Sequence, residues 1–322
     1  MDCGAATPSQ RGWEPRRRQS RNDPFSRLPP NLPERWEIKE TVRKLYYWKL
    51  KRREIQLGER TTLMGVLNVT PDSFSDGGKY LDPDSAFARA LELEEQGADI
   101  VDIGAESTRP GSARISAAEE IRRLIPVLKR LKDRLNVPIS VDTYKAEVAE
   151  RALELGVEIV NDPSGLTFEP QLARVVSNHD AGLVLNHMRG RPETWDKLGP
   201  LSDPMGTIAR DLDAAVSRAR HIGIDKSRLV IDPGIGFGKR KEQDSLIIGH
   251  LRSLASLDLP ILVGPSRKRF LAHGSPEETK SATAAAVAAC VLAGAHILRV
   301  HDVQEMRAAA DVADEILRHS TA

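Results

Sequence analysis

The chain has very few cysteines: Cys3 and Cys290 are the only two among 322 residues. Two cysteines so far apart exclude a disulfide framework and a cysteine-based zinc site. Long hydrophobic runs are also missing, because the closest candidate, residues 282–298, is mostly alanine and is interrupted by Gly294 and His296. A membrane-spanning helix needs about 18 or more consecutive apolar residues, so the sequence excludes one and we expect no membrane partner.

The signatures of several common enzyme classes are absent as well. No nucleophile elbow marks a serine hydrolase, and no set of His, Asp and Glu has the spacing of zinc ligands. Residues 232–239 are rich in glycine, but they lack the Gly-Lys-Ser/Thr ending of a P-loop and the spacing of a dinucleotide-binding fingerprint. We expect this flexible segment to let Phe237 and Lys239 line a pocket.

Charge is balanced overall but not along the chain. The 47 Lys and Arg nearly cancel the 46 Asp and Glu, yet residues 1–60 hold 15 basic and 8 acidic side chains. Residues 1–35 are rich in Arg, Pro, Ser and Asn, which predicts a disordered basic tail. Contact with nucleic acid is one interpretation of the run 16–18, but a solvated tail accounts for it better and we expect no nucleic-acid partner.

Residues 36–60 are expected to cover the main domain. The apolar spacing over Trp36–Ile55 predicts one amphipathic helix, or a helix and a short strand.

From Thr61 onward, short β-rich runs alternate with longer helical patterns. The expected strands are Thr62–Leu67, Asp99–Ile103, Pro138–Val141, Glu158–Val160, Gly182–Asn186, Arg228–Ile231, Pro260–Val263 and His296–Val300. The expected helices are Pro83–Gln96, Ser116–Leu135, Tyr144–Leu155, Pro170–Ser177, Pro204–His221, Glu242–Leu257, Glu277–Ala293 and Val303–His319. Eight such units, with strands too apolar for a one-sided sheet, predict an α/β fold. We expect an eight-stranded parallel β/α (TIM) barrel over residues 61–320, with an N-terminal extension. A doubly wound open sheet is the alternative, because periodicity does not show whether a sheet closes.

Polar residues follow nearly every expected strand, where the loops of a β/α barrel carry its functional groups. They are Asn68, Asp102, residues 106–109, Asp142, Asn161, Asp162, His187, Asp232, residues 266–268, Arg299 and His301. The cations among them, Arg267, Lys268, Arg299 and His301, follow the last two strands, where such barrels often bind phosphate, and they predict a diphosphate site. A surface salt bridge is the alternative for any single cation. Asn68 offers an oxygen suited to a magnesium ion that otherwise keeps waters and phosphate oxygens.

Three of these residues end strands whose preceding residues are apolar, and they are expected to project into the barrel mouth: Asp142, Asn161 and Asp232. Two carboxylates and an amide suit the donor and acceptor edge of a flat nitrogen heterocycle. The alternative is that they cap the following helices, as Asp and Asn commonly do.

Two loops are long and contain glycine, residues 68–78 and 106–111. Their Pro and Gly residues suit lids that order over a ligand. A plain surface loop does not need Phe74, Asp76 and Arg109, so these residues are expected to face the site.

Eight segments together resemble the dihydropteroate synthase family of the folate pathway. They are LMGVLNVTPDSFSDGG (63–78), GADIVDIGAESTRPG (97–111), ISVDT (139–143), ND with SG (161–165), HMRG (187–190), DPGIGFGK (232–239), SRK (266–268) and RVHD (299–302). The first two are long and highly specific, and the set spans about three quarters of the chain. Two positions depart from the family pattern: Asn186 replaces a usual apolar residue, and Pro163 replaces a residue that is often β-branched.

Carried over to the matching positions, the resemblance implies a set of site residues. The pterin ring would be held by Asp142, Asn161, Met188, Asp232, Phe237 and Lys268. The diphosphate would be held by Asn68, Thr108, Arg109, Arg299 and His301, with Asn68 also on magnesium. The p-aminobenzoate pocket would be shaped by Phe74, Arg109, Pro110 and Ser266. The catalytic residues would be Asp76, Asp142 and Lys268.

The implied reaction is displacement of diphosphate from a pterin methylene carbon by the amine of p-aminobenzoate. It needs no side-chain nucleophile, in agreement with the absence of one here. The resemblance further implies a cytoplasmic homodimer that sulfonamides target, with residues 282–293 and the last helix at the interface. Two alternatives remain: a pterin-binding methyltransferase domain that serves a corrinoid protein, and a catalytically silent paralogue.

Overall fold

The computed structural model describes Met1 and residues 43–70, 82–107, 114–272 and 274–320. The predicted basic tail and the first part of the predicted cover lie outside these residues. So do five of the predicted site residues: Phe74, Asp76, Thr108, Arg109 and Pro110.

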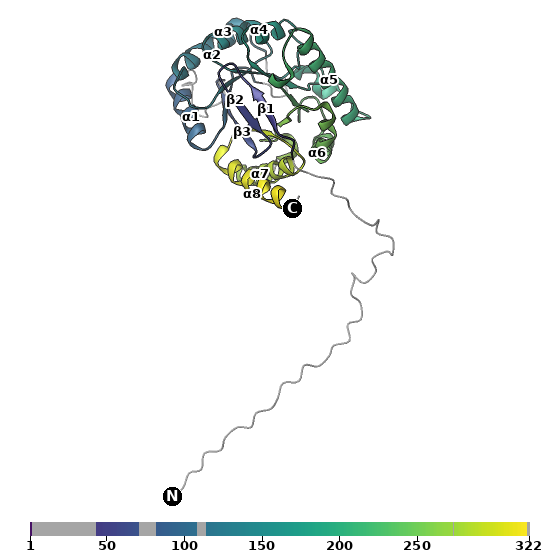
Figure 1. Cartoon of the computed structure of the whole chain (residues 1–322). Coiled ribbons are helices and arrows are strands. Elements are labelled where there is room, and N and C mark those ends of the chain that lie inside the picture. The colour runs from purple at the N-terminus through teal and green to yellow at the C-terminus, as the bar shows by residue number, and fades with distance from the viewer. Residues whose placement is uncertain (2–42, 71–81, 108–113, 273, 321–322) are drawn as a thin grey trace. The chain divides into compact units, whose positions relative to one another are not determined.

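Eight parallel strands form the centre of the fold (Figure 1). They are β3 (Thr62–Asn68), β4 (Ile100–Gly104), β5 (Ile139–Asp142), β6 (Ile159–Asp162), β7 (Gly182–Asn186), β8 (Leu229–Asp232), β9 (Leu262–Val263) and β10 (Ile297–Val300). Their order in the sheet is β8-β7-β6-β5-β4-β3-β10-β9. A parallel bridge between Ile231 and Ile261 joins the two outer strands, so the sheet closes on itself. The predicted barrel is confirmed.

Helices follow the strands and surround them (Figure 1). They are α1 (Pro83–Glu95), α2 (Ala117–Leu131), α3 (Ala146–Glu154), α4 (Leu172–Asn178), α5 (Pro204–His221), α6 (Lys241–Gly249), α7 (Pro276–Leu292) and α8 (Val303–His319). Short 3₁₀ helices occupy Pro192–Lys197, Lys226–Arg228, Leu251–Leu257 and Arg269–Leu271. The helix predicted over Glu242–Leu257 is thus divided, because α6 ends at Gly249 and a 3₁₀ helix follows. Ser116 caps α2, since its hydroxyl accepts a hydrogen bond from the Glu119 N–H at 3.2 Å.

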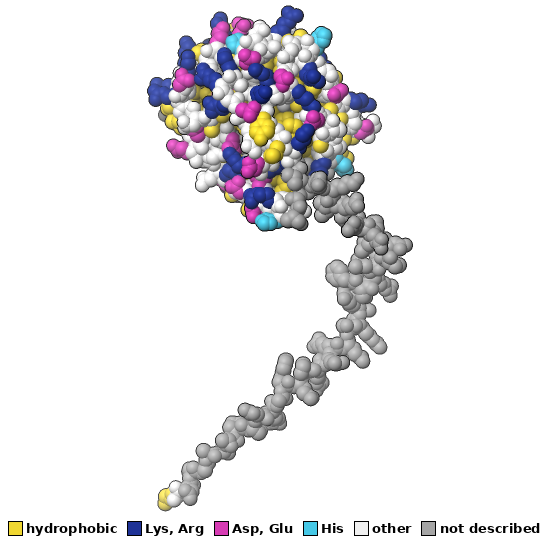
Figure 2. Space-filling view, viewed as in Figure 1, with side chains coloured by type: hydrophobic (Ala, Val, Ile, Leu, Met, Phe, Trp, Pro, Cys, Tyr) yellow, Lys and Arg dark blue, Asp and Glu magenta, His cyan; other side chains and the backbone are white. Residues whose placement is uncertain are grey.

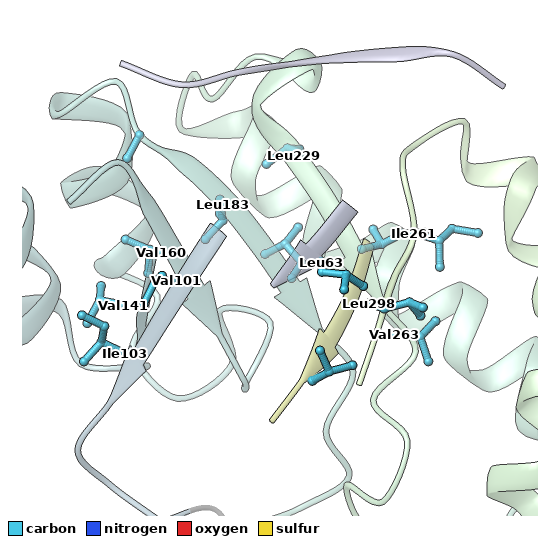
Figure 3. Close-up of a cluster of buried hydrophobic side chains, with 14 of the residues drawn as sticks. Leu63, Val101, Ile103, Val141, Val160, Leu183, Leu229, Ile261, Val263 and Leu298 are labelled. Carbon is cyan, nitrogen blue, oxygen red and sulfur yellow. The ribbon is translucent and has the colours of Figure 1, made fainter. Parts of the chain in front are cut away.

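One hydrophobic core lies between the strands and the helices. Each strand turns alternate side chains outward, and these pack against apolar helix residues. Figure 3 labels members of this core that come from the strands or lie next to them: Leu63, Val101, Ile103, Val141, Val160, Leu183, Leu229, Ile261, Val263 and Leu298.

A second core fills the interior of the barrel at the end where the strands begin, called the lower interior below. The strands contribute Met64, Ile100, Ile159, Val184, Val230, Leu262 and Ile297. A β-hairpin of β1 (Tyr46–Lys49) and β2 (Glu54–Leu57) adds Trp48, Leu50 and Leu57 to the same cluster. The indole of Trp48 is buried and donates a hydrogen bond to the Arg228 carbonyl at 2.9 Å. The hairpin therefore closes the end of the barrel at which the strands begin.

A single helix over Trp36–Ile55 is wrong, whereas the alternative of a helix and a short strand lies partly outside the described residues. Residues 43–57 contain two strands, and the described part of Trp36–Ile55 holds no helix. The sequence was compatible with both, because Tyr46, Trp48 and Leu50 also repeat with the period of two that a strand requires. Burial of Trp48 and Leu50 against the barrel end decides between them.

Candidate active site

The side chains inside the barrel change from apolar to polar between one inward-facing position of a strand and the next. In a strand, residues two apart face the same side. Two residues beyond the apolar interior positions Ile100, Ile159, Val184, Val230 and Ile297 stand Asp102, Asn161, Asn186, Asp232 and Arg299. Asp142 joins this layer because it pairs with Asn161 in register. A ring of polar side chains therefore lies inside the carboxyl-terminal end of the barrel.

Arg299 is the centre of one half of this ring. Its Nε donates to Asp102 Oδ2 at 2.6 Å, and its Nη2 donates to Asp142 Oδ2 at 2.6 Å. Asn161 Nδ2 donates to the same oxygen of Asp102 at 3.1 Å. Three residues predicted to bind ligand are therefore brought together, and Asp102 holds two of them in place.

Asp102 is a residue that sequence reasoning placed at a strand end without giving it a role. It is fully buried, and it lies opposite Ser140 in the register of β4 and β5. The signal was present, because Asp102 follows the interior residue Ile100 by two positions. Its link to Arg299 was not visible, since 197 positions separate the two residues.

The charged groups of this half lie close enough to shift the pKa values of one another. Burial opposes the positive charge of Arg299, but the carboxylates of Asp102 and Asp142 outweigh it and raise the pKa of the guanidinium further. Burial also raises the pKa of Asp142, while the nearby Arg299 acts in the opposite direction. The guanidinium has five N–H donors, of which two bond these carboxylates, so it keeps donors for a ligand.

Asp232 and Lys268 form the other half. Burial raises the pKa of Asp232 to about 6, although the Gly234 N–H, which donates to its Oδ1 at 2.7 Å, favours the ionised form. Burial lowers the pKa of Lys268 to about 8. The ammonium of Lys268 lies 4.5 Å from the centre of the Phe237 ring, in a cation–π contact. Asp232, Phe237 and Lys268 are thus neighbours, as predicted for one wall of a heterocycle site.

The cations after the last two strands do not all face the mouth. Arg267 pairs with Asp302 at 2.7 Å, and its side chain is 54% exposed, which is the surface salt bridge considered as the alternative. His301 Nδ1 lies 2.9 Å from the Ser266 hydroxyl, and Ser266 is buried. This contact joins a predicted diphosphate residue to a predicted p-aminobenzoate residue.

The two departures from the family pattern touch each other. The Asn186 amide donates to the Pro163 carbonyl at 2.6 Å, and it is buried. Asn186 therefore fastens the loop that follows Asn161 to the end of the next strand. Met188 lies just beyond it, half-buried, at the edge of a cavity of about 260 Å³.

Asn68 ends β3 opposite Gly104 and is half-buried. The described residues hold no group of three or more His, Cys, Asp and Glu that would chelate a metal. A single amide oxygen fits a magnesium ion that brings most of its ligands with it as water and substrate phosphate.

One face of the molecule shows how the charged side chains are distributed. On the face shown in Figure 2, basic and acidic side chains are interspersed. None of the described helices has both the length and the hydropathy needed to span a membrane.

Comparison with known proteins identifies the family of the chain. The family model described as pterin binding enzyme matches residues 64–301. A dihydropteroate synthase from Synechocystis is 43% identical over 265 residues, which cover 81% of this chain and 92% of that protein.

Solved structures agree as well. A dihydropteroate synthase from Clostridium difficile, crystallised in the presence of pteroic acid, has 42% identity and a TM-score of 0.75 over 81% of this chain and 98% of that chain. A dihydropteroate synthase from Xanthomonas albilineans with 4-aminobenzoic acid has 37% identity and a TM-score of 0.78, over 85% of this chain and 98% of that chain. The chain therefore belongs to the pterin-binding enzyme family and, within it, to the dihydropteroate synthases, transferases of folate synthesis.

Proposed function

We propose that the protein joins 6-hydroxymethyl-7,8-dihydropterin diphosphate to p-aminobenzoate. The amine nitrogen forms a bond to the pterin methylene carbon, and the bond from that carbon to the diphosphate oxygen breaks. Diphosphate leaves with the bonding electron pair, the nitrogen loses a proton, and 7,8-dihydropteroate remains. The observation that carries the proposal is the ring of buried polar groups around Arg299 and Asp232 inside the barrel mouth.

In this proposal the pterin ring enters that polar layer. Asp142, Asn161 and Asp232 supply acceptors and donors for its edge, because buried polar groups discriminate strongly against a ring that leaves them unpaired. Phe237 and Met188 supply apolar contact. Lys268 holds positive charge beside Asp232, which keeps that carboxylate ionised near neutral pH.

The diphosphate lies at the outer edge of the pterin site. Arg299 and His301 would neutralise the charge that develops on the leaving group, together with Thr108 and Arg109. Asn68 would hold magnesium, which when bound adds positive charge beside the phosphate oxygens.

The second substrate would occupy a pocket shaped by Phe74, Arg109, Pro110 and Ser266. Ser266 contacts His301, so this pocket adjoins the leaving group. The carboxylates of Asp76 and Asp142 would stabilise positive charge on the methylene carbon as diphosphate departs.

The proposal includes a cytoplasmic homodimer that uses α7 and α8. Val312 and Ile316, one turn apart on α8, are 62% and 52% exposed, and apolar side chains of this kind suit a subunit interface. Light scattering after size-exclusion chromatography should give twice the monomer mass for the wild type. The double variant Val312→Glu/Ile316→Glu should have the mass of a monomer. A monomeric wild type would contradict the interface.

The function is tested by p-aminobenzoate-dependent release of diphosphate, with magnesium and with a chelator. We expect turnover that requires both magnesium and p-aminobenzoate. Asp142→Ala and Lys268→Ala should abolish turnover while circular dichroism still shows a folded barrel. Unchanged turnover in either variant would refute the assigned roles. Pterin binding without any diphosphate release would instead indicate a silent paralogue, and methyl transfer to a corrinoid protein would indicate the methyltransferase.

A further inference from the structure

Lys239 ends the glycine-rich segment that follows β8, and its ammonium lies among backbone carbonyls. The Nζ atom donates to the carbonyl oxygens of Gly234 at 2.7 Å, His187 at 2.9 Å and Phe237 at 3.4 Å. An ammonium has three N–H donors, so these contacts use all of them. Lys239 therefore has no donor left for a substrate, and the pocket-lining role predicted for it is not the main one.

The three carbonyls belong to two different parts of the chain. Gly234 and Phe237 lie in the loop that leaves β8, whereas His187 follows directly after β7. Lys239 thus joins the loop to the end of the neighbouring strand. Burial lowers the pKa of Lys239 to about 7, while the carboxylates of Asp244 and Asp232 favour the charged ammonium.

The joined loop carries two residues of the pterin site. Gly234 donates its N–H to Asp232 Oδ1 at 2.7 Å, so the position of Gly234 sets the orientation of that carboxylate. The backbone at Gly234 has φ +68°, and an added Cβ would lie 2.0 Å from the His187 carbonyl oxygen. The loop therefore packs directly on the strand end, at the point where Lys239 bonds the same carbonyl.

Phe237 is held from three sides. Lys239 bonds its carbonyl, and Lys268 lies over its ring at 4.5 Å. The indole of Trp195 meets the ring edge-on, with centroids 5.6 Å apart, and donates to the Arg189 carbonyl at 2.8 Å. Release of the loop would move Phe237 relative to Lys268, although neither side chain had changed.

From these contacts we infer that Lys239 is a positioning residue for the pterin: its ammonium fixes the loop 232–239 on the end of β7 so that Asp232 and Phe237 keep their places. The inference rests on the proposed function for the identity of the ligand. It assigns Lys239 an effect on the pterin side of the site and none on p-aminobenzoate.

The test compares Lys239→Met with wild type, because Met fills similar space but donates no hydrogen bond. The ligand is 6-hydroxymethyl-7,8-dihydropterin diphosphate with magnesium, and its binding to the full chain is measured by titration calorimetry. We expect affinity to fall about tenfold or more, since misplacement of site groups by about 1 Å has effects of this size. The KM for p-aminobenzoate should stay within about twofold. Lys241→Met, at an exposed position two residues further on, is the matched control and should bind like wild type.

A purely structural role predicts a different result. It would lower the melting temperature of Lys239→Met and leave the pterin affinity of the folded protein unchanged, which would overturn the inference. Should Lys239→Met fail to fold, Lys239→Gln decides, because Gln keeps two donors. Its pterin affinity should fall by a smaller factor, and wild-type affinity would overturn the inference. Ethylammonium should restore pterin affinity to Lys239→Ala.

The experiment separates this inference from the function itself. Calorimetry reports pterin binding whether or not turnover follows. A wild type that binds the pterin but releases no diphosphate refutes the proposed reaction and leaves the role of Lys239 to be judged from the variants. A wild type that turns over normally, with Lys239→Met equal to it in pterin affinity, refutes the inference alone.

Discussion

Replacement of Asp102 tests whether this buried carboxylate organises the polar layer of the barrel. Asp102 is fully buried, and its Oδ2 accepts hydrogen bonds from both Arg299 and Asn161. Asp102→Ala removes both bonds. Asp102→Asn can keep an oxygen at the same place, so it removes mainly the charge, and it places an NH₂ group where Oδ1 has no partner among the described residues.

The size of the effect follows from these contacts. Loss of one partner of a buried ion pair costs about 3–5 kcal/mol of unfolding free energy. Asp142 still pairs with Arg299 at 2.6 Å, so we expect the lower end, about 3 kcal/mol, for Asp102→Ala. For a chain of this size that corresponds to a melting temperature lower by about 4–5 °C. Asp102→Asn should cost about 1–2 kcal/mol, the penalty of one buried unsatisfied group.

Thermal unfolding followed by circular dichroism measures the loss of stability, and steady-state kinetics measures the effect on substrate binding. Because Arg299 and Asn161 are both proposed to bind the pterin diphosphate, its KM should rise about tenfold or more in Asp102→Ala. The exposed Asp213 on α5 provides the control, and Asp213→Ala should stay within about 0.5 kcal/mol of wild type. Melting temperatures of both Asp102 variants within about 1 °C of wild type would refute the reasoning.

Two further predictions concern the loop after β8 and the carboxylate that precedes it. Gly234→Ala should lower the unfolding free energy by more than about 2 kcal/mol, because φ is +68° and the added Cβ would meet a carbonyl at 2.0 Å. In urea denaturation the control Gly249→Ala, with nothing within 4 Å, should stay within about 1 kcal/mol, and equal effects would contradict the conformational explanation. Burial raises the pKa of Asp232 to about 6, so the KM for the pterin should rise as the pH falls below about 6, and Asp232→Asn should lose this dependence. The same shift from the ordinary 3.8 makes a stabilising contribution that is complete below pH 3.8 and lost as the pH rises through about 6; urea titrations showing the opposite slope would contradict it.

The strands of the barrel were predictable because their pattern is local. A buried parallel strand needs only four to seven consecutive apolar residues, and a polar residue directly after it marks the mouth. Asp142, Asn161 and Asp232 were identified in this way, and the structure places all three at strand ends. The period of two, continued by one inward-facing position beyond the interior residues Ile100 and Val184, would have placed Asp102 and Asn186 in the same polar layer.

The contacts between these residues were not predictable, because they depend on closure. Arg299 reaches Asp102 and Asp142 only when the last part of the sheet lies beside the first, across 197 and 157 positions of sequence. The hairpin at Tyr46–Leu57 was missed for a related reason. Its strands are extended because Trp48 and Leu50 pack into the barrel, so the local pattern alone did not decide between helix and strand.

The hairpin also constrains the order in which the protein can fold. Trp48 is synthesised before any barrel strand, yet its partners in the lower interior include Val230, Leu262 and Ile297 from the last three strands. A chain emerging from the ribosome therefore cannot complete the burial of these early apolar residues until the last strands exist. Contacts of such long sequence separation slow folding, because loop closure has to precede them. Nascent chains that stop before β10 should expose both the hairpin and the apolar lower interior of the barrel. Chaperone binding and aggregation should compete for these incomplete chains.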